Sequence, residues 1–129
     1  LLTSGFSLGA NEMTKAIPSE VGQLTGLVAA GGNNEHAFLS YNEFSGRIPT
    51  QLGRWTGLTA GFQIRQNSFT GSIPTQFGLW TNFVGTYTTN DGEEKTTTTY
   101  GFRIGFNSLS GAIPRYSMDN LMKDGVHEG

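Results

Sequence analysis

The chain has 129 residues, a formal net charge of −2 and no cysteine. The length predicts a single domain, the weak negative charge excludes a general electrostatic attraction to nucleic acid, and the lack of cysteine excludes disulfides, thiolate catalysis and thiolate metal sites. The chain also lacks any run of about eighteen apolar residues that could span a membrane as a helix.

A motif built on asparagine recurs four times along the chain. An Ile-Pro pair follows six residues after each anchor, and the anchors are Asn11, Asn42, Asn67 and Asn107. The first three copies also share a glycine eleven residues after the asparagine, at Gly22, Gly53 and Gly78. Coincident anchors of this kind predict a repeat protein, whose units stack to bury a continuous core.

Apolar residues stand at alternate positions before each asparagine, for example Phe62 and Ile64 before Asn67. This alternation predicts a short strand with one buried face. The asparagine amide can bond backbone groups where the chain turns inward, so we expect the four asparagines to form a buried ladder. The Ile-Pro pair predicts an extended, non-helical return.

The repeat resembles the leucine-rich-repeat family, in its plant-type subclass LxLxxNxLSGxIPxxLGxLTxL, and residues 62–81 match that consensus almost throughout. The resemblance implies an α/β-type solenoid: a right-handed superhelix of about four repeats, with short parallel strands on the concave face and mostly irregular or 3-10 returns. The chain departs from the family pattern in three ways. Trp55 and Trp80 replace leucines, Lys15 stands where the other copies have glycine, and the flanking cysteine-rich caps are missing.

The spacing of the anchors divides this single domain into repeats at about 5–27, 36–58, 61–83 and 101–115. Insertions are expected at about 28–35 and 84–100, both immediately before a strand. In the second insertion, Thr- and Tyr-rich arms flank Asn90, Asp91 and Gly92, which predicts an antiparallel hairpin over 86–99 that continues from the edge of the fourth strand. Residues 116–129 are expected to cap the last repeat with a short helix that begins at Ser117.

Residues suited to catalysis or metal binding are sparse. His36 and His127 are the only imidazoles, and Asp91, Glu93 and Glu94 lie at a turn where a solvated tip is favoured over a calcium site. No glycine-rich phosphate cradle is present. The sequence therefore predicts no enzyme activity, no cofactor and no metal.

Binding is better supported, because side chains at alternate strand positions must point out of the concave face. The candidate ligand-binding residues are Phe38, Tyr41, Gln63, Arg65, Gln66, Arg103 and Phe106. Exposed aromatics beside arginine and glutamine are typical of surfaces that recognise a protein, a peptide or a glycan. The alternative is that the two insertions cover this face and the aromatics pack beneath them.

Two other functions remain open. A subunit of a filament or larger assembly would stack through its solenoid ends, which would explain the missing caps. An ice-binding protein would use regular hydroxyl columns, here Thr14, Ser45, Thr70 and Ser110, and Ser19, Thr50 and Thr75. The family resemblance favours neither, since its members commonly serve as receptor ectodomains, inhibitors or adhesion modules outside the cell or at its surface.

Overall fold

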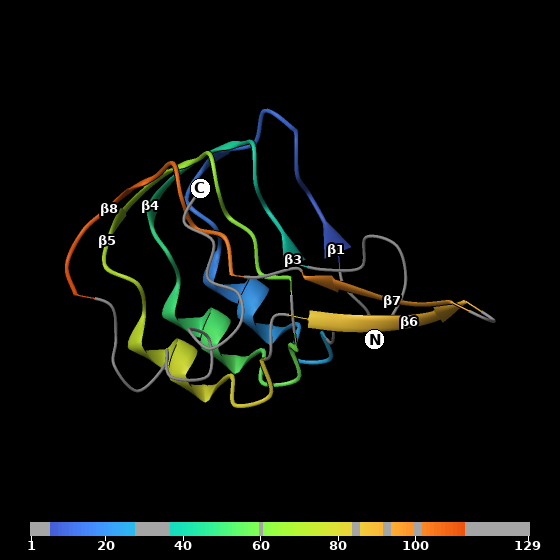
Figure 1. Cartoon of the computed structure of the whole chain (residues 1–129). Helices are drawn as coiled ribbons and strands as arrows, with labels where there is room; N and C mark the ends of the chain where they lie inside the picture. The colour runs from blue at the N-terminus through green and yellow to red at the C-terminus, as the bar shows by residue number, and fades with distance from the viewer. Residues whose placement is uncertain are drawn as a thin grey trace.

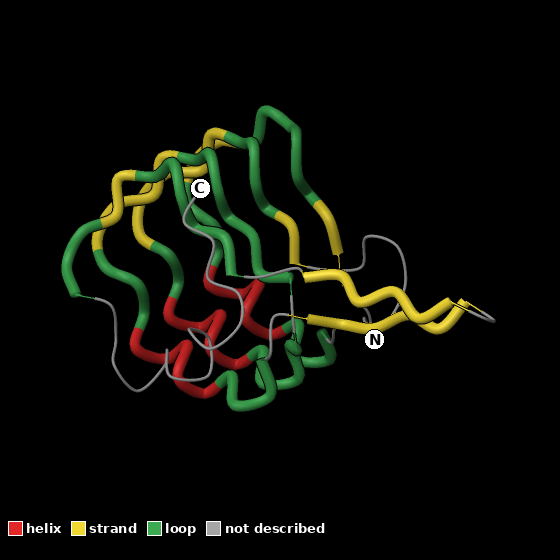
Figure 2. The backbone as a smooth tube through the Cα atoms, viewed as in Figure 1, coloured by secondary structure: helices red, strands yellow, loops and turns green. Residues whose placement is uncertain are grey.

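The computed structural model of the chain describes residues 6–27, 37–59, 61–83, 86–91, 94–99 and 102–112. For residues 6, 37–38, 86–91 and 94–99 the description is of the backbone. The insertion expected at 28–35 and the cap expected at 116–129 lie outside the described residues, as do His36 and His127. The described repeats form a three-sided stack, with a parallel sheet on each of two sides and a row of 3-10 helices on the third (Figures 1 and 2).

The first sheet crosses all four repeats. Strand β1 (Phe6–Ser7) pairs in parallel with β3 (Ala37–Phe38). The backbone ladder then continues, because the N–H of Leu39 donates to the carbonyl of Gln63 at 2.8 Å and Gln63 bridges in parallel to Arg103. The alternating apolar side chains are fully buried, at Leu39, Phe62, Ile64 and Phe102. The predicted parallel strands are thus confirmed.

Asparagine side chains join one repeat to the next where this sheet ends. The Asn67 amide donates to Ile64 and Arg65 in its own turn, at 3.1 and 3.3 Å, and to Leu39 of the preceding repeat at 3.0 Å. Its oxygen accepts the N–H of Phe44 at 3.1 Å. The same bonds recur at Asn42 and Asn107. Asn67 is half-buried rather than fully buried.

The residue before each asparagine has a left-handed backbone. Its φ is 55°, 59°, 52° and 55° at Ala10, Tyr41, Gln66 and Phe106. For a residue with a Cβ this conformation costs about 1–2 kcal/mol. The ladder offsets this cost, because Tyr41 still donates to the carbonyl of Arg65 at 3.0 Å and Asn42 to that of Gln66 at 3.3 Å.

A second parallel sheet follows directly after the asparagines, and the sequence pattern did not predict it. It comprises β2 (Thr14–Lys15), β4 (Glu43–Arg47), β5 (Ser68–Gly71) and β8 (Ser108–Leu109), in the order β2-β4-β5-β8. In the second and third repeats the apolar residue two positions after the asparagine, Phe44 or Phe69, points into the core, and Leu109 of the fourth packs against it, whereas Met13 of the first is exposed. The strands reach a second left-handed residue, with φ between 70° and 89°, at Lys15, Gly46, Gly71 and Gly111.

Three 3-10 helices form the remaining side: η1 (Ser19–Gln23), η2 (Thr50–Arg54) and η3 (Thr75–Leu79). Each begins directly after the proline of an Ile-Pro pair, whose φ of −60° to −63° favours the start of a helical turn. The shared glycines let these helices stack closely. A Cβ on Gly22 would lie 2.5 Å from the carbonyl oxygen of Gln51, and one on Gly53 would lie 2.6 Å from the Cβ of Gln76.

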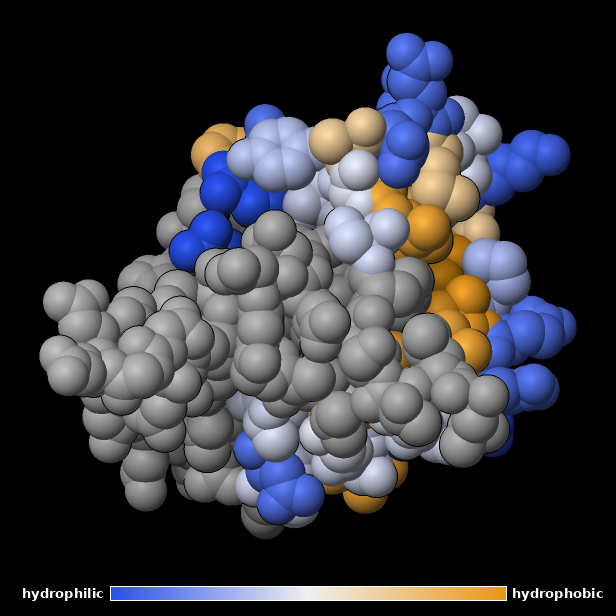
Figure 3. Space-filling model, turned by 90° about the vertical axis from the view of Figure 1, so that its right-hand side faces the viewer, coloured by the Kyte–Doolittle hydropathy of each residue, from blue (hydrophilic) through white to orange (hydrophobic). Residues whose placement is uncertain are grey.

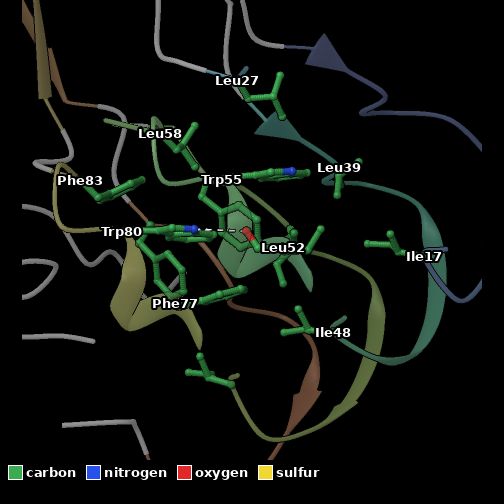
Figure 4. Packing of buried hydrophobic residues seen from close by; sticks show 14 of the residues in the cluster. Ile17, Leu27, Leu39, Ile48, Leu52, Trp55, Leu58, Phe77, Trp80 and Phe83 are labelled. Atoms are coloured by element: carbon green, nitrogen blue, oxygen red, sulfur yellow. Dashed lines mark hydrogen bonds between the residues drawn. The ribbon is translucent and has the colours of Figure 1, made fainter. Parts of the chain in front are cut away.

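The core between the three sides is rich in aromatic side chains (Figure 4). The ring of Phe62 lies 5.0 Å from that of Trp80 and 5.4 Å from that of Phe102, measured between centroids. The two tryptophans, which replace leucines of the consensus, also bond across repeats. Trp55 donates its indole N–H to the carbonyl of Val21, and Trp80 to that of Leu52, both at 3.2 Å.

The second insertion contains the expected hairpin. Strands β6 (Thr86–Asp91) and β7 (Glu94–Thr99) pair antiparallel from Thr86 with Thr99 to Asp91 with Glu94. Asn90 and Asp91, which were expected in the turn, are still within the paired strands. The hairpin forms a two-stranded sheet of its own and projects to one side of the stack (Figure 1), so the expected continuation from the fourth strand is not present among the described residues.

Candidate functional site

The outward surface of the first sheet, here called the concave face, carries the candidate binding residues. Two of them, Tyr41 and Phe106, are 50% and 59% exposed. Both occupy the left-handed position before an asparagine, in the second and fourth repeats. Bulky residues held in such a conformation are uncommon and often belong to functional surfaces.

Arg65, from the third repeat, lies between these two aromatic rings. Its guanidinium carbon is 5.4 Å from the ring centre of Tyr41 and 5.6 Å from that of Phe106. Both distances fall within the range of cation–π attraction, which contributes about 0.5–1 kcal/mol at exposed sites. The parallel register brings the three residues together, since each comes from a different repeat. We refer to Tyr41, Arg65 and Phe106 as the aromatic–arginine cluster.

Beside this cluster the concave face is polar and more deeply buried. Ser40 is 3% exposed and Gln63 is 5% exposed, while Arg103 is half-buried. Within the described part of the chain, three buried atoms here have no hydrogen-bond partner: the Oγ of Ser40 and the Nε of Arg65 and of Arg103. Polar groups of this kind are usually paired in folded proteins. The concave face therefore has unused hydrogen-bonding capacity beside exposed aromatic rings.

One of the candidate residues requires correction. Gln63 was expected on the accessible surface, but it is 5% exposed and cannot offer a binding surface of its own. Strand alternation fixes the side of the sheet from which a side chain points, but not whether other parts of the chain lie over it. Gln66 is exposed as expected. The side chain of Phe38 lies outside the described residues, although its backbone belongs to β3.

The sequence did not predict that Ser40 is buried without a hydrogen-bond partner, or that Arg65 contacts two aromatic rings. Ser40 stands two residues before Asn42, and strand alternation places it on the same face as Arg65, but nothing in its residue type signals burial without a partner. The ring contacts depend on side-chain conformations that spacing does not specify. The only sequence signal for them was the coincidence of aromatic residues immediately before Asn42 and Asn107.

The other surfaces of the described stack provide fewer features suited to binding a ligand. A hollow of about 210 Å³ between η2 and η3 is lined by Thr50, Gln51, Gly53, Arg54, Gln76 and Leu79. The described residues contain no cluster of three or more histidine, aspartate or glutamate side chains placed to hold a metal ion. None of the helices described is long and apolar enough to cross a membrane.

The N-terminal end of the described stack differs from its interior. Leu8 and Met13 are 36% and 37% exposed, whereas Leu39 and Phe44, their counterparts in the second repeat, are 1% and 5% exposed. Asn11 bonds only the carbonyls of Leu8 and Gly9 in its own turn. The side of the molecule that faces the viewer in Figure 3 accordingly combines an apolar strip with strongly hydrophilic residues.

No protein-family model and no curated protein sequence matches this chain. Solved structures do match. The BIR2 ectodomain from Arabidopsis thaliana is 25% identical, with a TM-score of 0.63, over 85% of this chain and 45% of that one. The plant peptide hormone receptor RGFR1, solved in complex with RGF2, is 27% identical, with a TM-score of 0.62, over 89% of this chain and 15% of that one.

A third match is the LRR ectodomain of the plant membrane receptor kinase GASSHO1/SCHENGEN3 from Arabidopsis thaliana, solved in complex with CASPARIAN STRIP INTEGRITY FACTOR 2. It is 25% identical, with a TM-score of 0.58, over 88% of this chain and 14% of that one. The present chain thus spans less than half of the length of each matched protein.

Proposed function

This chain belongs to the leucine-rich-repeat family, and we propose that it is a non-catalytic recognition module that binds a protein or peptide through its concave face. The observation that carries the proposal is the aromatic–arginine cluster, in which two exposed rings flank one guanidinium. Tyrosine and arginine are enriched among the residues that dominate interface energies. The cluster joins three repeats, so it offers one continuous contact area to a partner.

The matched structures support a partner of this class. RGFR1 and GASSHO1/SCHENGEN3 were each solved in complex with a second molecule, RGF2 and CASPARIAN STRIP INTEGRITY FACTOR 2 respectively. By analogy with these receptors we propose that the present chain also works outside the cell or at the cell surface. The exposed fractions of Tyr41 and Phe106 argue against the alternative that the insertions cover these rings.

Selection from a random peptide library tests the proposal and defines the preferred ligand in the same experiment. The immobilised chain should enrich a set of related peptides. The Tyr41→Ala/Phe106→Ala double variant, used in a parallel selection, should enrich none of them, while Leu79→Ala, which removes an exposed apolar side chain from η3, should enrich the same set. Enrichment of the same peptides by the double variant would place binding elsewhere.

Stacking through the solenoid ends is the second candidate function, and the N-terminal end provides a specific observation in its favour. Leu8 and Met13 expose core positions there, and Asn11 lacks the bonds that Asn42 makes to a preceding repeat. A neighbouring copy would supply apolar side chains to cover Leu8 and Met13 and backbone groups to bond Asn11. Light scattering decides, since this function requires a mass that grows with protein concentration and falls when Leu8 and Met13 are replaced by serine.

For the ice-binding alternative, the expected hydroxyl column at Thr14, Ser45, Thr70 and Ser110 lies along the second sheet. Thr14, Thr70 and Ser110 are exposed on that side and Ser45 is half-buried. Strand β4, which carries Ser45, also carries the charged residues Glu43 and Arg47, however, and these interrupt a flat hydroxyl surface. A measurement of thermal hysteresis separates this function from recognition, which predicts none.

A further inference from the structure

We propose that the hollow of about 210 Å³ between η2 and η3 binds one sugar ring of a neutral glycan. The two helices lie on the side of the stack that carries no sheet (Figures 1 and 2), so the hollow is separate from the concave face. The inference goes beyond the proposed function, because it assigns a second class of ligand to a second side of the molecule. Three observations carry it: the orientation of two glutamine amides, the neutral charge of the helix row, and the size of the hollow.

The first observation concerns the two amides. Gln51 and Gln76 line the hollow and occupy equivalent positions in η2 and η3, directly after a threonine. The hydroxyl of Thr50 donates to the Oε1 of Gln51 at 3.3 Å, and that of Thr75 donates to the Oε1 of Gln76 at 3.4 Å. Each amide oxygen thus has a partner, whereas neither Nε2 donates to another residue in the described part of the chain. The hollow therefore offers unused N–H donors from two neighbouring repeats.

The rest of the polar lining adds to these donors. Arg54, the last residue of η2, is exposed and forms no ion pair within the described ranges. Its guanidinium can only donate, through N–H groups in one plane. The complementary ligand therefore carries several oxygen acceptors close together. Adjacent hydroxyls of a sugar meet this requirement, because each oxygen accepts hydrogen bonds and can also donate one to the oxygen of Thr50.

The second observation favours a neutral ligand over an anion. Among the residues of the three described 3-10 helices, the charged ones are Glu20 in η1 and Arg54 in η2, so their charges cancel along the row. Arg54 is also exposed to water, and an ion pair between exposed groups contributes little. A carboxylate or phosphate would thus gain little attraction here. A sugar hydroxyl forms the same hydrogen bonds without the loss of a charge's hydration.

The third observation concerns size and shape. The hollow is smaller than the clefts of about 300–1,000 Å³ that hold whole small molecules. Gly53 lines it without a side chain, and a Cβ there would lie 2.6 Å from the Cβ of Gln76. Leu79 adds an apolar side chain that is 55% exposed. A pyranose ring has C–H groups on its faces and hydroxyls around its edge, so Leu79 can cover a face while the amides bond the edge. One ring fits, and the rest of the glycan extends into solvent.

Nuclear magnetic resonance of the glutamine side-chain NH₂ groups tests the site directly. The probes are neutral tetrasaccharides of glucose, galactose and mannose, each beside its uronate counterpart, in which the hydroxymethyl groups are oxidised to carboxylates. We expect at least one neutral tetrasaccharide to shift the signals of Gln51 and Gln76 together, with a Kd in the millimolar range or lower. Its uronate should bind no more tightly. Binding by uronates alone would overturn the site in favour of attraction to Arg54, and the absence of any shift with all probes would also overturn it.

Matched variants separate a built site from weak contacts elsewhere on the surface. Gln51→Ala and Gln76→Ala keep the Cβ and remove an amide that is half-buried or exposed, so the fold should persist. Each should weaken binding of the responding tetrasaccharide at least fivefold. Gln23→Ala removes an exposed glutamine from η1, outside the hollow, and should leave the Kd unchanged. Equal weakening by Gln23→Ala and Gln51→Ala would overturn the site, as would undiminished binding by both lining variants.

The two ligands keep the failure of this inference distinct from that of the proposed function. Sugar binding in the hollow requires neither Tyr41 nor Phe106, and peptide recognition on the concave face requires neither Gln51 nor Gln76. A successful peptide selection without any neutral sugar bound would leave the recognition function intact and overturn the glycan site. Neutral sugars that shift the ring signals of Tyr41 and Phe106, but not the glutamine NH₂ signals, would overturn it as well and place the glycan on the concave face.

Discussion

The indole N–H of Trp80 donates to the backbone carbonyl of Leu52 at 3.2 Å, one repeat earlier in the stack. Trp55 bonds Val21 in the same manner, so the tryptophans, which directly follow η2 and η3, provide a second set of links between repeats. Leucine, which the family consensus has at these positions, can fill the core but cannot make this bond.

Trp80→Phe should therefore destabilise the chain by about 0.5–1.5 kcal/mol, because the carbonyl of Leu52 loses the indole donor but keeps the backbone N–H of Trp55 at 3.1 Å. Urea denaturation followed by circular dichroism measures the difference in unfolding free energy. Leu79→Ala serves as the neighbouring control, since its side chain is 55% exposed and its loss should cost no more than about 0.5 kcal/mol. Equal stabilities of Trp80→Phe and the unaltered chain would show that the indole hydrogen bond does not stabilise the fold.

Asn67→Ala should cost about 1–3 kcal/mol, because three carbonyls lose a shared donor and the N–H of Phe44 loses its acceptor. Asn11→Ala is the matched comparison. Asn11 is exposed and bonds only its own turn, so its replacement should cost less than half as much. The account of the ladder fails if the two variants unfold at the same denaturant concentration.

Lys15→Gly should stabilise the chain by up to about 1 kcal/mol, because glycine adopts the φ of 70° found at this position without the clash of a Cβ. Lys15→Ala, which keeps a Cβ, should bring no comparable gain. Gly71→Ala should have the opposite sign, since a Cβ there combines a φ of 77° with a contact of 3.3 Å to Arg47. Thermal unfolding of the three variants checks the signs.

Deletion of residues 88–97 should leave the stack folded, because β6 and β7 pair only with each other among the described strands and surface insertions are tolerated. Circular dichroism and a single cooperative unfolding transition are the measurements. A loss of cooperativity would mean that the hairpin belongs to the folding unit. The same deletion also tests whether the hairpin contributes to ligand binding.

The sequence predicted the first sheet and its asparagine turns well, because both depend on spacing. The anchors at Asn42 and Asn67 determine the register, and the alternating apolar residues before them determine the buried side. The second sheet was not predicted, since each of its strands has at most one inward apolar residue, such as Phe44 or Phe69, and β2 has none. The sequence showed only that Lys15 replaces the glycine of the other copies, and it did not show that Lys15 adopts their left-handed backbone.

The candidate site was predictable in position but not in exposure or contact. Alternation placed Tyr41, Gln63 and Arg65 on one face of the sheet. Burial of Gln63 depends on what lies above the sheet, which no local pattern encodes. The enclosure of Arg65 by two rings depends on side-chain conformations in three separate repeats.

The affinity of a library-selected peptide for the Tyr41→Ala/Phe106→Ala double variant tests recognition through the concave face most directly. Both rings are exposed, so their removal should leave the circular dichroism spectrum unchanged. Isothermal titration should show binding at least tenfold weaker than that of the unaltered chain, which corresponds to about 1.4 kcal/mol. Undiminished binding by this variant, together with loss of binding when Leu8 and Met13 are replaced by serine, would contradict the account and locate recognition at the end of the stack.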